Sequence, residues 1–409
     1  MAKSEEKDTM KSFVIITGGT GFLGVNLILH LLKQKTPPHI IVMDNYVSSS
    51  PEALMCALEN HPYKDHVHNY MTSTDICDKK EVTEALYHSV KCSDPSQANI
   101  KEIYHLASIA SPPRYKNHPI ATMDVSYIGT KNMLHLAIKF GAKLLFTSTS
   151  EVYGDAKEHP QNEEYYGNVN CYGERSCYDE GKRAAEALIL SYRKVFPSLN
   201  TRIVRIFNTY GPFMDMEDGR IVTEIARAGV SGDPITVYGN GEQTRSFCYV
   251  DDLLKMMMVV MNSDVSAPVN IGNDAEISIN EIVETGKTIM EKHTEEWTSM
   301  KPYSVKYEPL EKDDPKMRRP ELTKIKTMVK EATGKEMVYT PLKEGLYKTL
   351  GYFDAVSGDN FDEYMQWLDT VVQCEAEENN GLWDVGGIVG SVFALVSYLP
   401  RIIGRVLFA

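Results

Sequence analysis

The sequence predicts an α/β protein with a doubly wound parallel sheet, followed by a smaller substrate-binding domain and a C-terminal extension. Two observations predict the sheet: short apolar runs occur at intervals, and amphipathic helical stretches separate them. The apolar runs cover residues 13–17, 40–43, 103–107, 144–147 and 203–207. The helical stretches cover residues 25–33, 129–139 and 178–194. From about residue 222 the segments become irregular, which favours a smaller domain that covers the sheet.

Composition narrows the class of protein. The 409-residue chain has a formal net charge of -13, which argues against a nucleic-acid partner and requires a local basic pocket for any anionic substrate. Its seven cysteines form no Cys-x-x-Cys pair, so we expect neither a metal site nor a disulfide framework. The charged N-terminus has no apolar core of a signal peptide, and we expect a cytoplasmic protein.

A glycine-rich turn follows the first predicted strand and opens the first predicted helix. Gly18, Gly21 and Gly24 give the spacing G-x-x-G-x-x-G. Glycines at this place allow a tight turn and let the backbone approach a pyrophosphate, which then lies at the helix N-terminus. The strand-turn-helix context favours a Rossmann dinucleotide site over a tight turn without a ligand.

Asp44 ends the second predicted strand, about two dozen residues after the glycines. A carboxylate there accepts hydrogen bonds from both ribose hydroxyls and repels a 2′-phosphate, so NAD is favoured over NADP. Asp75 follows the next strand and either meets the adenine or is an ordinary loop carboxylate. The predicted cofactor site comprises Gly18, Gly21, Phe22, Leu23, Gly24, Asp44, Asn45, Asp75, Ile76, Leu106, Ala107, Ser108, Thr147, Tyr178 and Lys182.

Tyr178 and Lys182 are four residues apart and therefore share one face of a predicted helix. A nearby ammonium favours the phenolate, so the pair predicts a lowered Tyr pKa and a phenol that serves as a base. Hydroxyl side chains at residues 147–150 close the fourth predicted strand. Side chains at the carboxyl ends of parallel strands point into the crevice where ligands bind.

Taken together, these stretches resemble the extended short-chain dehydrogenases/reductases, and within them the UDP-glucuronate decarboxylases. The resemblance covers roughly residues 12–353 in the family's order. The matching segments are residues 105–113 (HLASIASPP), 148–155 (STSEVYGD), 176–183 (SCYDEGKR), 205–212 (RIFNTYGP), 218–220 (DGR), 237–239 (VYG), 243–245 (QTR) and 313–320 (DDPKMRRP).

The resemblance implies a catalytic triad of Thr149, Tyr178 and Lys182. Tyr178 takes the proton from the sugar O4 while NAD⁺ removes the C4 hydride, Lys182 holds the nicotinamide ribose, and Thr149 orients O4. A ketone at C4 turns the C6 carboxylate of UDP-glucuronate into a β-keto acid, which loses CO₂. Protonation at C5 and return of the hydride then give UDP-xylose and regenerate NAD⁺.

Ser150 and Glu151 separate this reaction from that of the related 4,6-dehydratases, which resemble the chain but carry Asp-Glu after the threonine. Ser150 cannot readily protonate a leaving hydroxyl, but it can donate a hydrogen bond to a C6 carboxylate, which an Asp would repel. Glu151 either relays a proton at C5 or is a hydrogen-bonded structural carboxylate.

Several polar residues are candidates for substrate binding. By resemblance Arg245 meets the nucleotide phosphates, Arg318 the carboxylate or diphosphate, and Asn208 the diphosphate side, while Arg220 completes a guanidinium clamp with them and with Arg319. Each arginine alone is more typical of a solvated surface charge.

The chain departs from the family at several positions near this site. The decarboxylases have Lys where Asp124 stands, and the family has Asn at Ser126 and Arg at Phe213. Two prolines of a flanking loop are replaced by Cys171 and Glu174. These changes leave the triad in place, and we expect them to affect affinity or substrate choice.

We divide the chain into a tail (1–11), a body (12–353), an acidic linker (354–380) and an apolar segment (381–409). Within the body, the NAD-binding part is mainly residues 12–210 and the substrate-binding part mainly 211–353. Asp384 and Arg401 bracket sixteen uncharged residues, which as a helix span about 24 Å against a hydrocarbon core of about 30 Å. The segment therefore either contacts a membrane, with Arg401 and Arg405 at its surface, or packs on protein.

Three alternatives to the decarboxylase remain: a UDP-hexose 4-epimerase or dehydratase-like enzyme, a decarboxylase that releases the 4-ketone, and an NAD-binding scaffold. The intact triad argues against the scaffold. By resemblance we expect a homodimer through helices near residues 125–140 and 178–195. Apolar positions there that serve either a dimer or the monomer core are Ala184, Ala185, Leu188 and Ile189.

Overall fold

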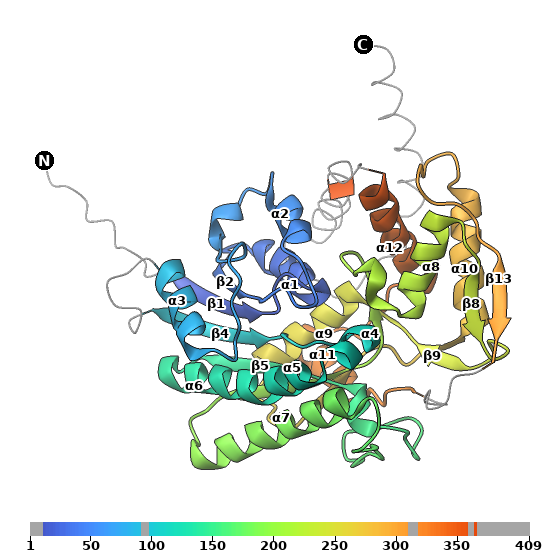
Figure 1. Cartoon of the computed structure of the whole chain (residues 1–409). Helices are drawn as coiled ribbons and strands as arrows, with labels where there is room; N and C mark the ends of the chain where they lie inside the picture. Colours follow the sequence, from blue (N-terminus) through green and yellow to red (C-terminus); the bar gives the residue numbers. More distant parts are fainter. Residues whose placement is uncertain (1–10, 91–97, 310–317, 359–363, 366–409) are drawn as a thin grey trace, which may run out of the picture.

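The computed structural model describes residues 11–90, 98–309, 318–358 and 364–365 (Figure 1). Its centre is a parallel sheet with the strand order β11-β6-β5-β4-β1-β2-β3. The strands are β1 (Ser12–Thr17), β2 (His39–Met43), β3 (Val67–His68), β4 (Asn99–His105), β5 (Lys143–Thr149), β6 (Thr201–Ile206) and β11 (Val269–Ile271).

This order confirms the predicted doubly wound sheet. The chain proceeds outward from β1 through β2 to β3, then returns to the other side of β1 with β4, β5 and β6. The direction reverses between β1 and β4, and in such sheets ligands bind in the crevice beyond the carboxyl ends of the strands at that point. All five strands expected from apolar runs are present, at slightly different bounds.

Helices cover both faces of the sheet (Figure 1). Side chains alternate along β1, so that Phe13 and Ile15 enter one apolar core while Val14 and Ile16 enter the other. One core contains the buried faces of α1 (Phe22–Leu32) and α9 (Val250–Asn262). The opposite core contains those of α3 (Lys79–Val90), α6 (Thr130–Phe140) and α7 (Ser176–Val195).

Short helices connect these elements near the carboxyl ends of the strands. They are α2 (Glu52–Leu58), α4 (Pro112–Asn117), α5 (Pro119–Asp124), the π-helical turn η3 (Val125–Gly129) and the 3₁₀ turn η4 (Ser150–Tyr153). The turn η3 joins α5 directly to α6, so the helical region begins well before residue 129, where the sequence pattern placed it.

The second half of the body forms a smaller layer of helices and two-stranded sheets. The helices are α8 (Ile221–Ser231), α10 (Ile279–Lys292), α11 (Thr323–Thr333) and α12 (Leu342–Ser357). The paired strands are β7 (Thr209–Tyr210) with β10 (Cys248–Tyr249), β8 (Ile235–Tyr238) with β13 (Val305–Glu308), and β9 (Thr244–Ser246) with β12 (Glu276–Ser278). Because β11 extends the central sheet, the two parts interleave after residue 210, and the division there stays a prediction.

The C-terminal region is described only in part. Helix α12 continues through residues 354–357, and Tyr364 is buried, donating a hydrogen bond to the Lys348 carbonyl at 3.3 Å. The rest of the predicted linker, and the whole apolar segment 381–409, lie outside the described residues. Among the helices that are described, none is both long and apolar enough to cross a membrane.

Candidate active site

A cavity of about 1280 Å³ lies at the carboxyl ends of the central strands, between the sheet and the smaller layer. With the exception of Arg319, every residue predicted from the sequence for catalysis, cofactor binding or substrate binding lines it. The prediction therefore selected residues that the fold brings together from segments as distant as residues 18 and 318.

One end of the cavity is built by the glycine-rich turn between β1 and α1. Gly18 has a positive φ of 70°, and a Cβ there would lie 2.8 Å from the Ala107 backbone. A Cβ on Gly24 would lie 2.2 Å from the Gly18 carbonyl oxygen, so the turn needs both glycines. The N-cap of helix α1 is Gly21, which offers no side chain to the free N–H groups of the first turn, and this suits an anion such as a diphosphate.

Asp44 follows directly after β2, and its carboxylate is fixed by three hydrogen bonds. It accepts hydrogen bonds from the backbone N–H of Thr20 (3.1 Å), from that of Tyr46 (3.0 Å) and from the Ser49 hydroxyl (3.0 Å). A buried, oriented acceptor at this place suits a ribose diol and disfavours a phosphate.

Two further residues at this end bear on the predicted cofactor site. The Asp75 carboxylate lines the cavity but also accepts a hydrogen bond from the Cys77 N–H at 2.9 Å, so both interpretations from the sequence still stand. The Ser108 hydroxyl is buried and has no hydrogen-bond partner among the described residues. A buried hydroxyl of this kind is suited to a ligand's polar group.

The predicted triad comes from β5 and α7. Thr149 ends β5, and its hydroxyl hydrogen-bonds to the Tyr178 phenol. Lys182, one turn along α7, donates to the Thr147 carbonyl at 2.8 Å, and its Nζ is 6.0 Å from the centre of the Tyr178 ring. Tyr115 stacks on the Tyr178 ring at 5.4 Å between centroids and holds the phenol in place.

The pKa values of this pair differ from the prediction. Burial raises the pKa of Tyr178 above its ordinary value, and the Thr149 hydrogen bond and the charge of Arg220 oppose that rise only in part. Burial also lowers the pKa of Lys182 to about 7, against the attraction of Glu186. The prediction that Lys182 lowers the Tyr178 pKa is therefore wrong for the protein alone, because burial disfavours the charged form of each group.

Glu151 is the centre of a buried ion cluster. Its oxygens accept hydrogen bonds from both terminal nitrogens of Arg318, at 2.6 and 3.0 Å, and from Arg175. Burial works against ionisation, but Arg318 and Arg175 outweigh it and hold the Glu151 pKa below its usual range. This geometry favours the second interpretation from the sequence, a carboxylate that holds two guanidinium groups.

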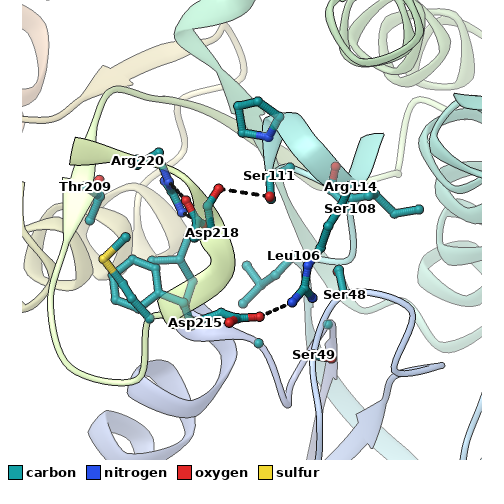
Figure 2. Close-up of a pocket in the computed structure, with 18 of the residues that line it drawn as sticks. Ser48, Ser49, Leu106, Ser108, Ser111, Arg114, Thr209, Asp215, Asp218 and Arg220 are labelled. Atoms are coloured by element: carbon teal, nitrogen blue, oxygen red, sulfur yellow. Dashed lines mark hydrogen bonds and ion pairs between the residues drawn. The ribbon is translucent and has the colours of Figure 1, made fainter. Parts of the chain in front are cut away.

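Figure 2 shows two segments that meet across the cavity, one with Ser111 and Arg114 and the other with Asp215, Asp218 and Arg220. Arg220 makes a two-pronged ion pair with Asp218, with one N–O distance of 2.7 Å, and the Ser111 hydroxyl donates to the Asp218 carbonyl at 3.0 Å. Arg114 pairs with Asp215, which lies on the same loop as Asp218. Arg220 also lies close enough to Tyr178 for its charge to act on the phenol.

The other predicted substrate residues are divided by the fold. Arg245 is buried and lines the cavity, donating to the Thr244 carbonyl at 2.8 Å, and Asn208 lines the cavity as well. Arg319 is not part of the cavity lining, and it pairs with Glu276 at 3.6 Å. The expected clamp therefore consists of Arg220, Arg245 and Arg318 without Arg319.

Comparison with known proteins gives the family. The chain matches the GDP-mannose 4,6 dehydratase family over residues 15–337. It is 40% identical to UDP-glucuronic acid decarboxylase 1 of Danio rerio over 348 residues, covering 85% of this chain and 73% of that protein. It is also 40% identical to UDP-glucuronic acid decarboxylase 6 of Arabidopsis thaliana over 316 residues, covering 77% of this chain and 82% of that protein.

The chain belongs to the UDP-glucuronic acid decarboxylase family. Solved structures agree with the fold. A UDP-glucose 4-epimerase of Thermotoga maritima, solved with UDP-glucose, superposes with a TM-score of 0.67 at 25% identity, over 84% of this chain and 99% of that one. A UDP-glucuronic acid 4-epimerase of Bacillus cereus, solved with UDP-glucuronic acid and NAD, gives a TM-score of 0.67 at 21% identity, over 84% and 99% of the two chains.

Of the departures expected from the family pattern, Asp124 and Phe213 line the cavity, whereas Ser126, Cys171 and Glu174 do not. Asp124 lies near Asp75, and with it acts on the Cys77 thiol, whose pKa burial raises to about 12. Ser126 is buried, and its hydroxyl donates to the Thr122 carbonyl at 2.9 Å. Phe213 adopts a φ of +67° and packs on Tyr352 with centroids 5.0 Å apart.

Sequence reasoning missed three residues of the site: Arg175, Tyr115 and Arg114. Arg175 could have been found, because residues 175, 178 and 182 share one face of a helix. Tyr115 and Arg114 gave no such signal, since they come from the separate helix α4. Among the described residues, no group of three or more His, Cys, Asp and Glu side chains is arranged to hold a metal ion.

Proposed function

We propose that this protein converts UDP-glucuronate into UDP-xylose and CO₂, with NAD as a bound cofactor that each cycle regenerates. One observation carries the proposal: a single cavity holds a phenol–threonine pair beside three guanidinium groups, Arg220, Arg245 and Arg318. The phenol–threonine pair suits oxidation of a sugar hydroxyl. The guanidinium groups suit a substrate with a diphosphate and a carboxylate.

NAD fits the other end of the cavity. Gly18 and Gly24 allow the tight turn that suits a diphosphate, Asp44 presents its carboxylate to a ribose, and Ser108 offers a hydroxyl that has no partner within the described part of the chain. NAD⁺, when bound, supplies the hydride acceptor for C4 and the donor for the return step. Neighbours solved with NAD, such as the Bacillus cereus epimerase, support this assignment.

Tyr178 takes the proton of the C4 hydroxyl while Thr149 holds that oxygen. Burial raises the Tyr178 pKa, so the phenol needs positive charge nearby to become a base. Arg220 supplies part of it. Lys182 has a pKa of about 7 and adds to it when protonated, while its contact with the Thr147 carbonyl fixes it beside the ring.

The ketone at C4 makes the next step a β-keto acid decarboxylation. The C5–C6 bond breaks, CO₂ leaves, and the bonding electrons pass into the enolate of the C4 ketone until C5 is protonated. Glu151 is held as a carboxylate by Arg175 and Arg318. It can therefore act at C5 only by passing on a proton taken from water. In the absence of substrate, its role is to hold the two arginines in place.

Ser150 supports decarboxylation over dehydration. It is buried at the start of η4 and lines the cavity beside Thr149. A hydroxyl there donates a hydrogen bond to a C6 carboxylate but is too weak an acid to protonate a leaving C6 hydroxyl. A carboxyl side chain at this position would repel the substrate carboxylate.

Product analysis tests the proposal. The full chain is incubated with UDP-glucuronate, and the nucleotide sugars are followed by NMR and mass spectrometry. UDP-xylose with released CO₂ is the expected result. An accumulating 4-ketone would mean decarboxylation without the return hydride, and UDP-galacturonate would replace the proposal with 4-epimerisation. No turnover would contradict the proposal, and neutral UDP-hexoses would then be tested as substrates.

We further propose a homodimer through the outer face of α5, η3 and α7. Ile120, Met123, Tyr127 and Leu190 expose 77%, 49%, 48% and 50% of their surfaces there, forming an apolar patch on adjacent helices. The predicted apolar positions are divided: Ala185 and Ile189 are buried in the monomer core, whereas Ala184 is exposed.

Light scattering on Ile120→Lys tests this surface, because a lysine at the centre of an apolar contact opposes association. The expected result is a dimer for the wild type and a monomer for the variant, and Val356→Lys at an exposed site on α12 is the control. A wild type that is monomeric at micromolar concentration would contradict the dimer.

Membrane contact through residues 381–409 is a separate proposal, supported by the uncharged run of residues 385–400 followed by Arg401 and Arg405. We also propose a cytoplasmic location for the body. Flotation with anionic vesicles, with and without residues 381–409, tests the contact. If neither protein floats with the vesicles, the membrane contact is ruled out.

A further inference from the structure

A series of hydrogen-bonded polar side chains runs from β5, the strand that ends in Thr149, to the segment that carries Arg318. At one end, the Ser148 hydroxyl, next to Thr149, donates to Glu186 at 2.5 Å. Glu186 makes a two-pronged pair with Arg205 at 2.8 and 3.0 Å. Arg205 then donates to the Tyr153 hydroxyl at 2.9 Å.

The series continues through two fully buried amides. The Tyr153 hydroxyl donates to the Asn270 side-chain oxygen at 2.7 Å. The Asn270 amide nitrogen donates in turn to the carbonyl oxygens of Gln161 and Glu321, at 3.0 and 3.3 Å. Asn270 and Gln161 are 0% and 1% exposed, so these bonds do not compete with water.

Gln161 holds residues 319–321 from both sides. Its backbone N–H donates to the Arg319 carbonyl at 2.9 Å, and its own carbonyl accepts from the Glu321 N–H at 2.8 Å. The side-chain oxygen accepts from the Arg319 N–H at 2.9 Å. Pro320, between these residues, has no N–H to offer, so the segment depends on the bonds that Gln161 supplies.

We infer that Gln161 and Asn270 are positioning residues that set Arg318 against Glu151 in the cavity. Neither residue lines the cavity, so neither touches a substrate there. Arg318 immediately precedes the clamped residues, and its guanidinium reaches Glu151 at 2.6 Å. Since the other end of the series is Ser148 on β5, one network fixes both the catalytic strand and the arginine that faces it.

The inference rests on the proposed function for its kinetic readout, because Arg318 is assigned there to the anionic substrate. Gln161→Met keeps the length of the side chain but removes the acceptor for the Arg319 N–H. Asn270→Asp keeps the shape but replaces the amide donor with a carboxylate facing two carbonyl oxygens, which is unfavourable. Gln161→Glu keeps that acceptor but replaces the amide donor to the Glu158 carbonyl, at 2.6 Å, with a buried carboxylate, so we expect it to behave like Gln161→Met.

We expect Gln161→Met and Asn270→Asp to raise the KM for UDP-glucuronate about tenfold, as for the loss of one buried hydrogen bond. The affinity for UDP, which lacks the sugar carboxylate, should change less than about twofold in all these variants. Tyr303→Phe is the control: it removes a buried hydroxyl that donates to the Val283 carbonyl at 2.7 Å, away from the cavity.

Amide hydrogen exchange of residues 318–323 gives a readout that needs no activity. Faster exchange in Gln161→Met and Asn270→Asp, with unchanged exchange in Tyr303→Phe, is the expected result. Unchanged exchange, or faster exchange with an unaltered KM, overturns the inference while leaving the proposed function intact. If the wild type does not convert UDP-glucuronate, the proposed function fails, and exchange alone then decides whether Gln161 and Asn270 hold this segment.

Discussion

Asp179, next to the proposed base, gives a direct test of the electrostatics in this site. It is 7% exposed, one of its oxygens has no hydrogen-bond partner among the described residues, and the other is 3.8 Å from Arg175. Burial, with repulsion from Glu151, raises the Asp179 pKa from 3.8 to about 7. The folded protein therefore retains a proton that the unfolded chain releases above about pH 4.

The size of the effect follows from this difference of about three pH units. At about 1.36 kcal/mol per unit, the ionised carboxylate costs the folded state up to about 4 kcal/mol above pH 7. The wild type should lose this stability as the pH rises from about 4 to 7. Asp179→Asn cannot ionise, and we expect it to be about 2–4 kcal/mol more stable than the wild type at pH 8 and nearly equal to it at pH 4.

Urea unfolding followed by circular dichroism at pH 4, 5, 6, 7 and 8 measures this difference. Glu84→Gln is the control with the same change of charge. Glu84 is exposed, and the variant loses only a surface ion pair with Lys80, at an N–O distance of 3.6 Å. A difference between Asp179→Asn and the wild type that stays constant with pH would refute the reasoning. So would a variant that is less stable at pH 8.

Three further predictions concern the same cavity. Tyr178→Phe should lower kcat by about 10²–10⁴ while leaving the fold intact, measured as turnover of UDP-glucuronate, and full activity would sink the mechanism. Glu151→Gln should destabilise the protein by about 2 kcal/mol in urea unfolding, since it removes the charge that the half-buried Arg175 and Arg318 share, and an unchanged midpoint would contradict the ion cluster. Asp44→Ala should weaken NAD binding about tenfold by calorimetry but spare binding of UDP, and equal losses for both ligands would point to general unfolding instead.

The sheet and its ligand crevice could be predicted because local and global signals agree. Each apolar run that predicted a strand is buried on both sides of a parallel sheet, as in β1, where alternate residues serve two cores. The glycine-rich turn was equally readable, since Gly18 and Gly24 are required by close backbone contacts. The motifs also selected candidate catalytic residues that line the same cavity.

The electrostatics and the partners of the site were not readable in the same way. Burial is a property of the folded chain, so the spacing of Tyr178 and Lys182 predicted the wrong direction for the phenol's pKa. The pairing of Glu151 with Arg318 joins residues 167 positions apart, and no local pattern announces it. Strand β11 was not predicted, because its three residues form too short an apolar run to be distinguished from a loop.

The central claim, a decarboxylation that passes through a C4 ketone and returns the same hydride, is tested most directly with labelled substrate. UDP-glucuronate carrying deuterium at C4 is incubated with the full chain in ordinary water, and unlabelled substrate is incubated in D₂O. We predict UDP-xylose that retains deuterium at C4 in the first experiment and gains one deuterium at C5 in the second. Loss of the C4 label, or a product that still carries its carboxylate, would contradict the account.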